Sequence, residues 1–172
     1  MYKRQSLDEC DAQIRRFAGW SVIDVLSVTG NELTRTEYAQ PALFALEVSL
    51  AKLWQSWGIL PSAVLGHSIG EAAAAHVAGA LSLETAARVV VLRGRLMEAA
   101  TGQGKMAVIY RGRTDVEKDL GPFGKALSIA CVNSPRSTVI SGEATAVDTL
   151  VAQMRDRGIT TRPVRVLSLI HI

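Results

Sequence analysis

Ser68 lies between two glycines in the stretch VLGHSIGEAAAAH, residues 64–76. When a short strand enters a helix through G-x-S-x-G, the serine hydroxyl is held at a sharp, strained turn, and the glycines leave room for the crowded backbone. The helix that follows points its free amides at this turn, so the amide of Ile69 can donate to an oxyanion. The pattern predicts a serine nucleophile at Ser68.

Arg93, on a later predicted helix, is the second residue suited to chemistry. The residues three and four positions away from it are all apolar: Val89, Val90, Leu96 and Met97. An arginine on an apolar face is costly unless an anion meets it, and its planar guanidinium can hold a carboxylate through two hydrogen bonds. We interpret Arg93 as a carboxylate clamp. The alternative is a side chain that crosses an apolar patch to reach water.

Two other arginines on the same helix have acidic neighbours. Glu84 lies four positions before Arg88, and Glu98 lies three positions after Arg95. Residues with this spacing face each other on a helix surface. We therefore expect both arginines to form surface ion pairs.

A serine nucleophile needs a base, and two of the three histidines do not meet that need. His67 adjoins Ser68, and adjacent side chains at a tight turn diverge, so we expect His67 to shape the turn. His76 lies eight residues farther along the chain, about 12 Å at 1.5 Å per residue, which is too far for a hydrogen bond. The third histidine, His171, stands in the C-terminal peptide SLIHI.

The spacing of apolar side chains predicts the elements that position Ser68. Residues 38–57 predict an amphipathic helix with Pro41 in its first turn. Its apolar positions are Leu43, Leu46, Leu50, Leu53, Trp54 and Trp57. Residues 62–66, SAVLG, predict a short buried strand that leads to the serine.

Two helices are predicted after the serine. Residues 70–80 are rich in alanine, and a further helix begins at the N-cap Ser82 and covers residues 83–100. The glycines in TGQGK, residues 101–105, mark a boundary.

Beyond this boundary strands and helices alternate. The predicted strands are 105–112, 126–133, 137–143 and 160–166, and the predicted helices are 114–123 and 145–158. The second of these helices has one apolar face, formed by Val147, Leu150, Val151 and Met154. The order β-α-β-β-α-β over residues 105–166 is that of a ferredoxin-like domain.

Composition excludes several classes of protein. No apolar run approaches the roughly 20 residues that a membrane span needs, and the N-terminus lacks the apolar region of a signal peptide, so we expect a cytoplasmic protein. The net charge is +3, but basic and acidic residues are interspersed, which argues against nucleic-acid binding. Cys10 and Cys131 are isolated, so we expect neither a metal site nor a disulfide.

The two termini match each other at the level of DNA. Residues 1–5, MYKRQ, can be encoded by codons whose reverse complement encodes LSLIH, and the chain ends in LSLIHI. The ends therefore resemble one short element read in opposite directions, as a transposase attaches when it fragments DNA. We expect residues 1–5 and 167–172 to be non-native, and the interior to be an internal fragment.

These motifs together resemble the acyltransferase domain of type I polyketide synthases, relatives of the malonyl-CoA:acyl-carrier-protein transacylases. The resemblance covers residues 7–166. It rests on residues 39–58, 66–90 and 130–143, and on an arginine 25 positions after the serine.

The resemblance implies an α/β fold in two parts. Residues 6–104 would be a partial α/β-hydrolase-like large subdomain, and residues 105–166 an inserted ferredoxin-like small subdomain. Ser68 would accept an acyl group from an acyl-CoA and pass it to the phosphopantetheine of an acyl carrier protein, beside a ketosynthase and other domains of a multidomain synthase. No covalently bound cofactor is implied.

The resemblance also assigns roles to single residues. Arg93 would hold the free carboxylate of the extender unit, and Ile69 would line the oxyanion hole. Gln40 and Asn133 match polar positions near the active site, which His67 would also line. In the family a hydrophobic residue after the serine accompanies malonyl, so the expected substrate is malonyl-CoA rather than methylmalonyl-CoA.

Two parts of the family's machinery are not found in this sequence. The family's histidine base lies after the last strand of the small subdomain in an A-F-H-S type sequence, whereas His171 lies in the peptide that an inverted DNA end explains. We do not assign His171 as the base. The N-terminal G-Q-G segment that supplies a second oxyanion amide in the family is also missing, so we expect this chain by itself to be inactive.

Two alternatives stay open at this point. An α/β-hydrolase esterase shares G-H-S-x-G, but it gives no reason for Arg93 or for a ferredoxin-like insertion. An inactive domain retained for docking within a synthase would need neither the base nor the clamp.

Overall fold

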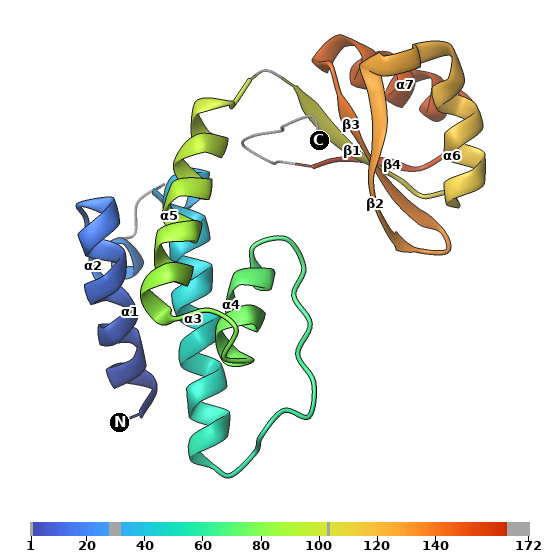
Figure 1. Ribbon diagram of the computed structural model, residues 1–172. Coiled ribbons are helices and arrows are strands. Elements are labelled where there is room, and N and C mark those ends of the chain that lie inside the picture. Colours follow the sequence, from blue (N-terminus) through green and yellow to red (C-terminus); the bar gives the residue numbers. More distant parts are fainter. Residues whose placement is uncertain (1, 28–31, 103, 165–172) are drawn as a thin grey trace. The chain divides into compact units, whose positions relative to one another are not determined.

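The computed structural model describes residues 2–27, 32–102 and 104–164 (Figure 1). The chain forms two compact units, residues 1–98 and 99–172. In the described residues the first unit contains only helices. The second contains a sheet, two α-helices and one 3₁₀ helix. None of the helices in these ranges is both long and apolar enough to span a bilayer.

The first unit is built from five α-helices and one 3₁₀ helix within its described residues. They are α1 (Tyr2–Ala18), α2 (Val22–Ser27), η1 (Glu32–Thr34), α3 (Thr36–Ser56), α4 (Gly70–Val77) and α5 (Leu83–Ala99). Their shared core includes Ile14 of α1, Phe44 and Val48 of α3, and Val90 and Val91 of α5.

No helix or strand is predicted from the sequence for residues 6–37, where the structure has α2 and most of α1. The buried carboxylate of Asp11 fixes the corner between these helices. Its Oδ1 accepts hydrogen bonds from Ser21 Oγ at 2.8 Å and from the amide of Val22 at 2.7 Å. Asp11 thus satisfies an amide that α2 would otherwise leave unpaired at its start.

The predicted helix around residues 38–57 is confirmed as α3, but its predicted apolar face is not the face that packs. Leu43, Trp54 and Trp57 are 47%, 50% and 63% exposed. The opposite side, which includes Ala42, Ala45 and Phe44, is buried and packs in the core of the first unit. Pro41 was also misplaced, since α3 begins at Thr36 and the proline lies inside the helix.

The predicted strand at residues 62–66 is wrong for this structure. The segment has no regular structure, and Val64 and Leu65 are 40% and 95% exposed. A strand needs a neighbour to satisfy its backbone groups, and all strands of the described chain belong to the second unit.

The two helices predicted after Ser68 are present as α4 and α5. α4 ends at Val77, earlier than expected. Ser82 caps α5 as predicted, because its Oγ accepts a hydrogen bond from the amide of Thr85 at 3.1 Å.

The second unit has the predicted order of elements. They are β1 (Lys105–Ile109), α6 (Arg113–Leu120), η2 (Gly121–Ala126), β2 (Leu127–Ser134), β3 (Ser137–Gly142), α7 (Ala144–Asp156) and β4 (Thr161–Val164). The strands are antiparallel in the order β2-β3-β1-β4. The predicted apolar face of α7 is buried and shares one core with the sheet and with α6.

Candidate active site

The turn at Ser68 has strained backbone geometry. Ser68 has φ 55°, and in the described chain all other residues with φ in the left-handed region are glycines. The neighbouring backbone encloses the turn tightly, because a Cβ at Gly66 would lie 2.2 Å from the amide nitrogen of Glu71. Only glycine fits at position 66. Such strain is typical of functional sites, and here it turns the serine hydroxyl outward, where Ser68 is exposed.

The backbone hydrogen bonds of this turn do not use the amide of Ile69. The amide of Gly70 donates to His67 O at 3.1 Å, and the amide of Glu71 donates to Ser68 O at 3.2 Å. The amide of Ile69 donates to no group of the described chain. This amide is free to donate to another group, and its role in an oxyanion hole stays a prediction.

Arg93 and Gln40 meet Ser68 from two other helices. Arg93 Nη2 donates to Ser68 Oγ at 3.0 Å, and Arg93 Nη1 donates to Gln40 Oε1. Gln40 is buried on α3, and its Nε2 donates to Thr36 Oγ1 at 2.8 Å and to Met97 Sδ at 3.1 Å. Three of the predicted site residues are thus brought together, and both polar atoms of the Gln40 amide are engaged.

Arg93 has no acidic partner within the described part of the chain.

The ion pairs predicted for the other two arginines are wrong. Arg95 Nη2 donates to the carbonyl of Ala18 at the end of α1, at 2.6 Å. Glu98 instead contacts Arg35 at 3.3 Å. Tertiary neighbours thus replace the expected partners on the same helix.

Glu84, the acid expected to pair with Arg88, pairs with Arg16 of α1 at 3.2 Å. The spacing of residues within α5 could not predict this ion pair, because Arg16 lies on another helix.

The histidines give no base for Ser68 among the described residues. His67 is exposed beside the serine. His76 Nδ1 lies 3.0 Å from Leu81 O, which ties the imidazole to the loop after α4. His171 lies outside the described residues.

Asn133 belongs to β2 of the second unit, where its Oδ1 lies 3.5 Å from Cys131 Sγ. Its place in the active site stays a prediction.

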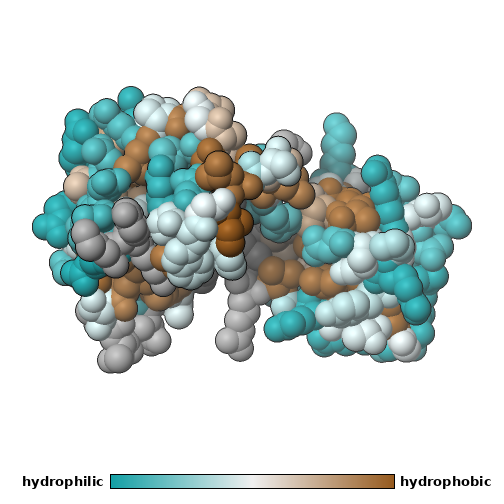
Figure 2. Space-filling view, turned by 90° about the horizontal axis from the view of Figure 1, so that it is seen from below, coloured by the Kyte–Doolittle hydropathy of each residue, from teal (hydrophilic) through white to brown (hydrophobic). Residues whose placement is uncertain are grey.

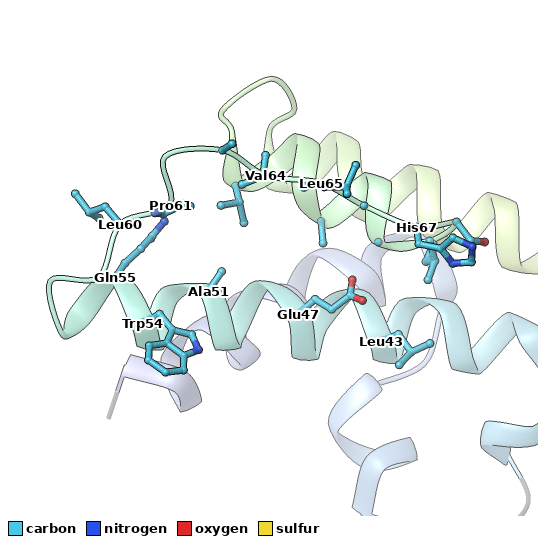
Figure 3. Close-up of a pocket in the computed structure, with 18 of the residues that line it drawn as sticks. Leu43, Glu47, Ala51, Trp54, Gln55, Leu60, Pro61, Val64, Leu65 and His67 are labelled. Atoms are coloured by element: carbon cyan, nitrogen blue, oxygen red, sulfur yellow. The ribbon is translucent and has the colours of Figure 1, made fainter. Parts of the chain in front are cut away.

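A cavity of about 880 Å³ extends from Ser68 between α3 and the chain that follows it (Figure 3). Its walls are mainly apolar and include Leu43, Trp54, Leu60, Val64, Leu65 and Val77. Figure 3 shows the carboxyl group of Glu47 rising from α3 into this space.

Glu47 is a residue that the sequence analysis missed. Its Oε2 is buried without a hydrogen-bond partner, and burial raises the pKa of its carboxyl group. The sequence carries the same signal for Glu47 as for Arg93, because its helix neighbours Leu43, Phe44, Leu50 and Ala51 are all apolar. Burial in this cavity thus opposes ionisation of the Glu47 carboxyl group.

Comparison with known proteins identifies the family. The family model for the acyl transferase domain matches residues 2–171. The chain belongs to this acyltransferase family. Among curated proteins this acyltransferase chain is 46% identical over 159 residues to erythronolide synthase EryA2 of Saccharopolyspora erythraea. It is 45% identical over 164 residues to the mycoketide-CoA synthase of Mycobacterium tuberculosis.

Solved acyltransferase domains share the fold. The acyltransferase domain from module 8 of the salinomycin polyketide synthase superposes with a TM-score of 0.90 at 38% identity, over 97% of this chain and 40% of that one. For MCAT from Streptococcus pneumoniae the TM-score is 0.83 at 29% identity, over 95% of this chain and 56% of that one.

The relatives are parts of multidomain polyketide synthases. The two curated matches cover 91% and 94% of this chain but only 4% of each synthase. The chain thus spans only a small part of these curated relatives, and its described residues form a mixed α/β structure that contains one small antiparallel sheet.

Proposed function

We propose that the parent domain of this chain transfers malonyl from malonyl-CoA to an acyl carrier protein through an ester on Ser68. By parent domain we mean a full-length acyltransferase domain that contains this sequence. The family supports acyl transfer, and the surroundings of Ser68 support the choice of an acyl group with a free carboxylate.

The reaction consists of two acyl transfers. Ser68 Oγ attacks the thioester carbonyl, its proton passes to a base, and the tetrahedral oxyanion is met by the amide of Ile69. Collapse of the intermediate expels the thiolate of CoA and leaves a malonyl ester on the serine. The thiol of the carrier's phosphopantetheine then attacks this ester, and the serine regains its proton as it leaves.

The observation that carries the proposal is the hydrogen bond between Arg93 and Ser68. Its length of 3.0 Å puts a cation without an acidic partner in the described chain directly beside the nucleophile. In malonyl a single methylene separates the ester carbonyl from the free carboxylate. That carboxylate would therefore fall within reach of the guanidinium, which can hold it through two hydrogen bonds.

Three further proposals concern the surroundings of this site. The small antiparallel unit would be a ferredoxin-like subdomain, and the first unit part of an α/β-hydrolase-like subdomain. Asn133 and His67 would line the active site near the acyl group. The partners would be an acyl carrier protein and neighbouring synthase domains such as a ketosynthase.

The test is the Arg93→Ala variant of the parent domain, with malonyl-CoA and acetyl-CoA as donors. Loss of the arginine leaves the malonyl carboxylate buried without a partner, which should cost about 2 to 5 kcal/mol in kcat/KM for malonyl-CoA. Acetyl-CoA has no such carboxylate and should be affected little. Equal losses for both donors would refute the clamp, and Ser68→Ala should abolish both reactions.

A further inference from the structure

The start of α3 is capped by a residue of another helix. Arg35 precedes α3 and makes no capping hydrogen bond with its side chain. The amide of Thr36, the first residue of α3, donates to Glu98 Oε2 at 2.9 Å, and Arg35 Nε donates to Glu98 Oε1 at 3.3 Å. A carboxylate here satisfies a free amide and opposes the positive end of the helix dipole. α5 therefore supplies the N-cap that α3 lacks.

One turn earlier on α5, Gly94 brings the same two helices into backbone contact. A Cβ at position 94 would lie 3.1 Å from Glu37 Cα and 3.1 Å from Thr36 O. Both neighbours are backbone atoms, so no flexible side chain can move aside. A larger residue at this buried position would push the first turn of α3 away by a few tenths of an ångström.

These two contacts lie next to the network that holds Arg93. Gln40 follows Thr36 by one turn, and its Nε2 donates to Thr36 Oγ1 at 2.8 Å. The other end of the Gln40 amide accepts the hydrogen bond from Arg93. A shift of the first turn of α3 therefore moves Gln40, and with it the support of the guanidinium.

We infer that Gly94 and Glu98 are positioning residues that set the selectivity of this site for acyl groups with a free carboxylate. They fix the first turn of α3 against α5 and so hold Arg93 at Ser68. The inference rests on the proposed function, because it takes Arg93 as the group that binds the substrate carboxylate.

Substitutions at Gly94 and Glu98 should lower kcat/KM more for malonyl-CoA than for acetyl-CoA. Bidentate binding of a carboxylate depends on the direction of the guanidinium, whereas an acetyl group makes no use of it. Because a misplacement of 1 Å can cost on the order of 100-fold, a shift of a few tenths should lower kcat/KM for malonyl-CoA about three- to tenfold.

The experiment compares Gly94→Ala, Glu98→Ala and Glu98→Gln in the parent domain, with malonyl-CoA and acetyl-CoA as donors. The first two variants should lower the malonyl-to-acetyl ratio of kcat/KM by about three- to tenfold. Glu98→Gln keeps an oxygen that can accept from the Thr36 amide, so it should retain most of the ratio. Thermal unfolding of each variant is measured alongside.

Two matched controls accompany these variants. Gly121→Ala adds the same methyl group where nothing lies within 4 Å, and Glu84→Gln removes the exposed acid of α5 that pairs with Arg16. Both should leave the ratio at the wild-type value.

The outcomes separate this inference from the proposed function. An unchanged ratio in Arg93→Ala refutes the proposed function. If Arg93→Ala collapses the ratio while Gly94→Ala and Glu98→Ala match the controls, the positioning role is wrong. Equal losses for both donors in these variants would also overturn it, since that result indicates a purely structural role. If Gly94→Ala yields no folded protein, the two Glu98 variants decide.

Discussion

The two units of this chain differ in how completely they bury their own apolar side chains. Of the exposed large hydrophobic residues in the described chain, twelve belong to the first unit and only Tyr110 and Val132 to the second. Figure 2 shows brown, hydrophobic side chains at the surface beside the teal ones. The second unit buries the apolar side of α7 against its own sheet and α6, all within residues 105–164.

Apolar periodicity thus identifies the apolar face of a helix but not the element that packs against it. On α7 the predicted face is buried by the adjacent sheet. On α3 the face that carries Leu43 and Trp54 lies open along the cavity, while the side with Ala42 and Ala45 packs. Both helices were recognised equally well from sequence.

The largest difference is expected when the two units are produced as separate polypeptides. A polypeptide of residues 99–166 should fold alone and unfold cooperatively, because its sheet and core are complete within that range. A polypeptide of residues 6–98 should self-associate or bind a hydrophobic dye, since large exposed apolar patches promote association. Circular dichroism, dye fluorescence and gel filtration measure both. A monomeric 6–98 polypeptide without dye binding would contradict the contrast.

Leucines in the two units should differ in their contribution to stability. Leu150 is fully buried in the second unit, so Leu150→Ala should reduce the free energy of unfolding by about 2 to 5 kcal/mol. Leu65 is 95% exposed, and Leu65→Ala should change it by less than about 0.5 kcal/mol. Chemical denaturation of the whole chain measures both changes. Similar values would mean that residue 65 is covered in solution.

Glu47 should make the first unit sensitive to pH. Burial raises its pKa above the ordinary value of 4.5, so the folded chain binds the proton more tightly than the unfolded chain. This contribution to stability is present below pH 4.5 and is lost as the pH rises through the folded-state pKa. Glu47→Gln should therefore be less sensitive to pH above 4.5 than the wild type.

Glu84→Gln serves as the control for this effect, because it removes an exposed carboxyl group from the same unit. Thermal unfolding between pH 4 and pH 7 follows all three proteins. Identical profiles for the wild type and Glu47→Gln would show that Glu47 is solvated.

The smallest expected effect concerns the two cysteines. Cys10 is fully buried in the first unit, and burial together with the nearby Glu9 raises its pKa to about 12. The thiolate is the reactive form, so a thiol reagent should modify Cys131 of the second unit first. Mass spectrometry of peptides gives the order. Faster modification of Cys10 would indicate that α1 opens readily.

The sequence predicted those parts whose determinants are local. The elements of the second unit and the cap at Ser82 follow from short patterns, and so does the strained turn at Ser68. The proximity of Arg93 to Ser68 was implied by family resemblance, and the hydrogen bond between them agrees with it.

The parts that failed depend on contacts between distant segments. Arg95 bonds to the end of α1, and Glu98 caps α3, although both had acceptable partners on their own helix. Residues 62–66 have the composition of a strand but pair with no strand in the described part of the chain. Asp11 could not be predicted from apolar periodicity, because it is a single polar residue. Its carboxylate holds the corner between α1 and α2 through hydrogen bonds.

The turn at Ser68 forms here without a paired strand before it, and this has a consequence for the order of assembly. Its closing hydrogen bonds join residues only three positions apart, and its tightest contact joins Gly66 to Glu71. Contacts of such short range close quickly and need no distant part of the chain. As the polypeptide leaves the ribosome, the turn at Ser68 can therefore reach its backbone geometry before the strands of the second unit have been synthesised.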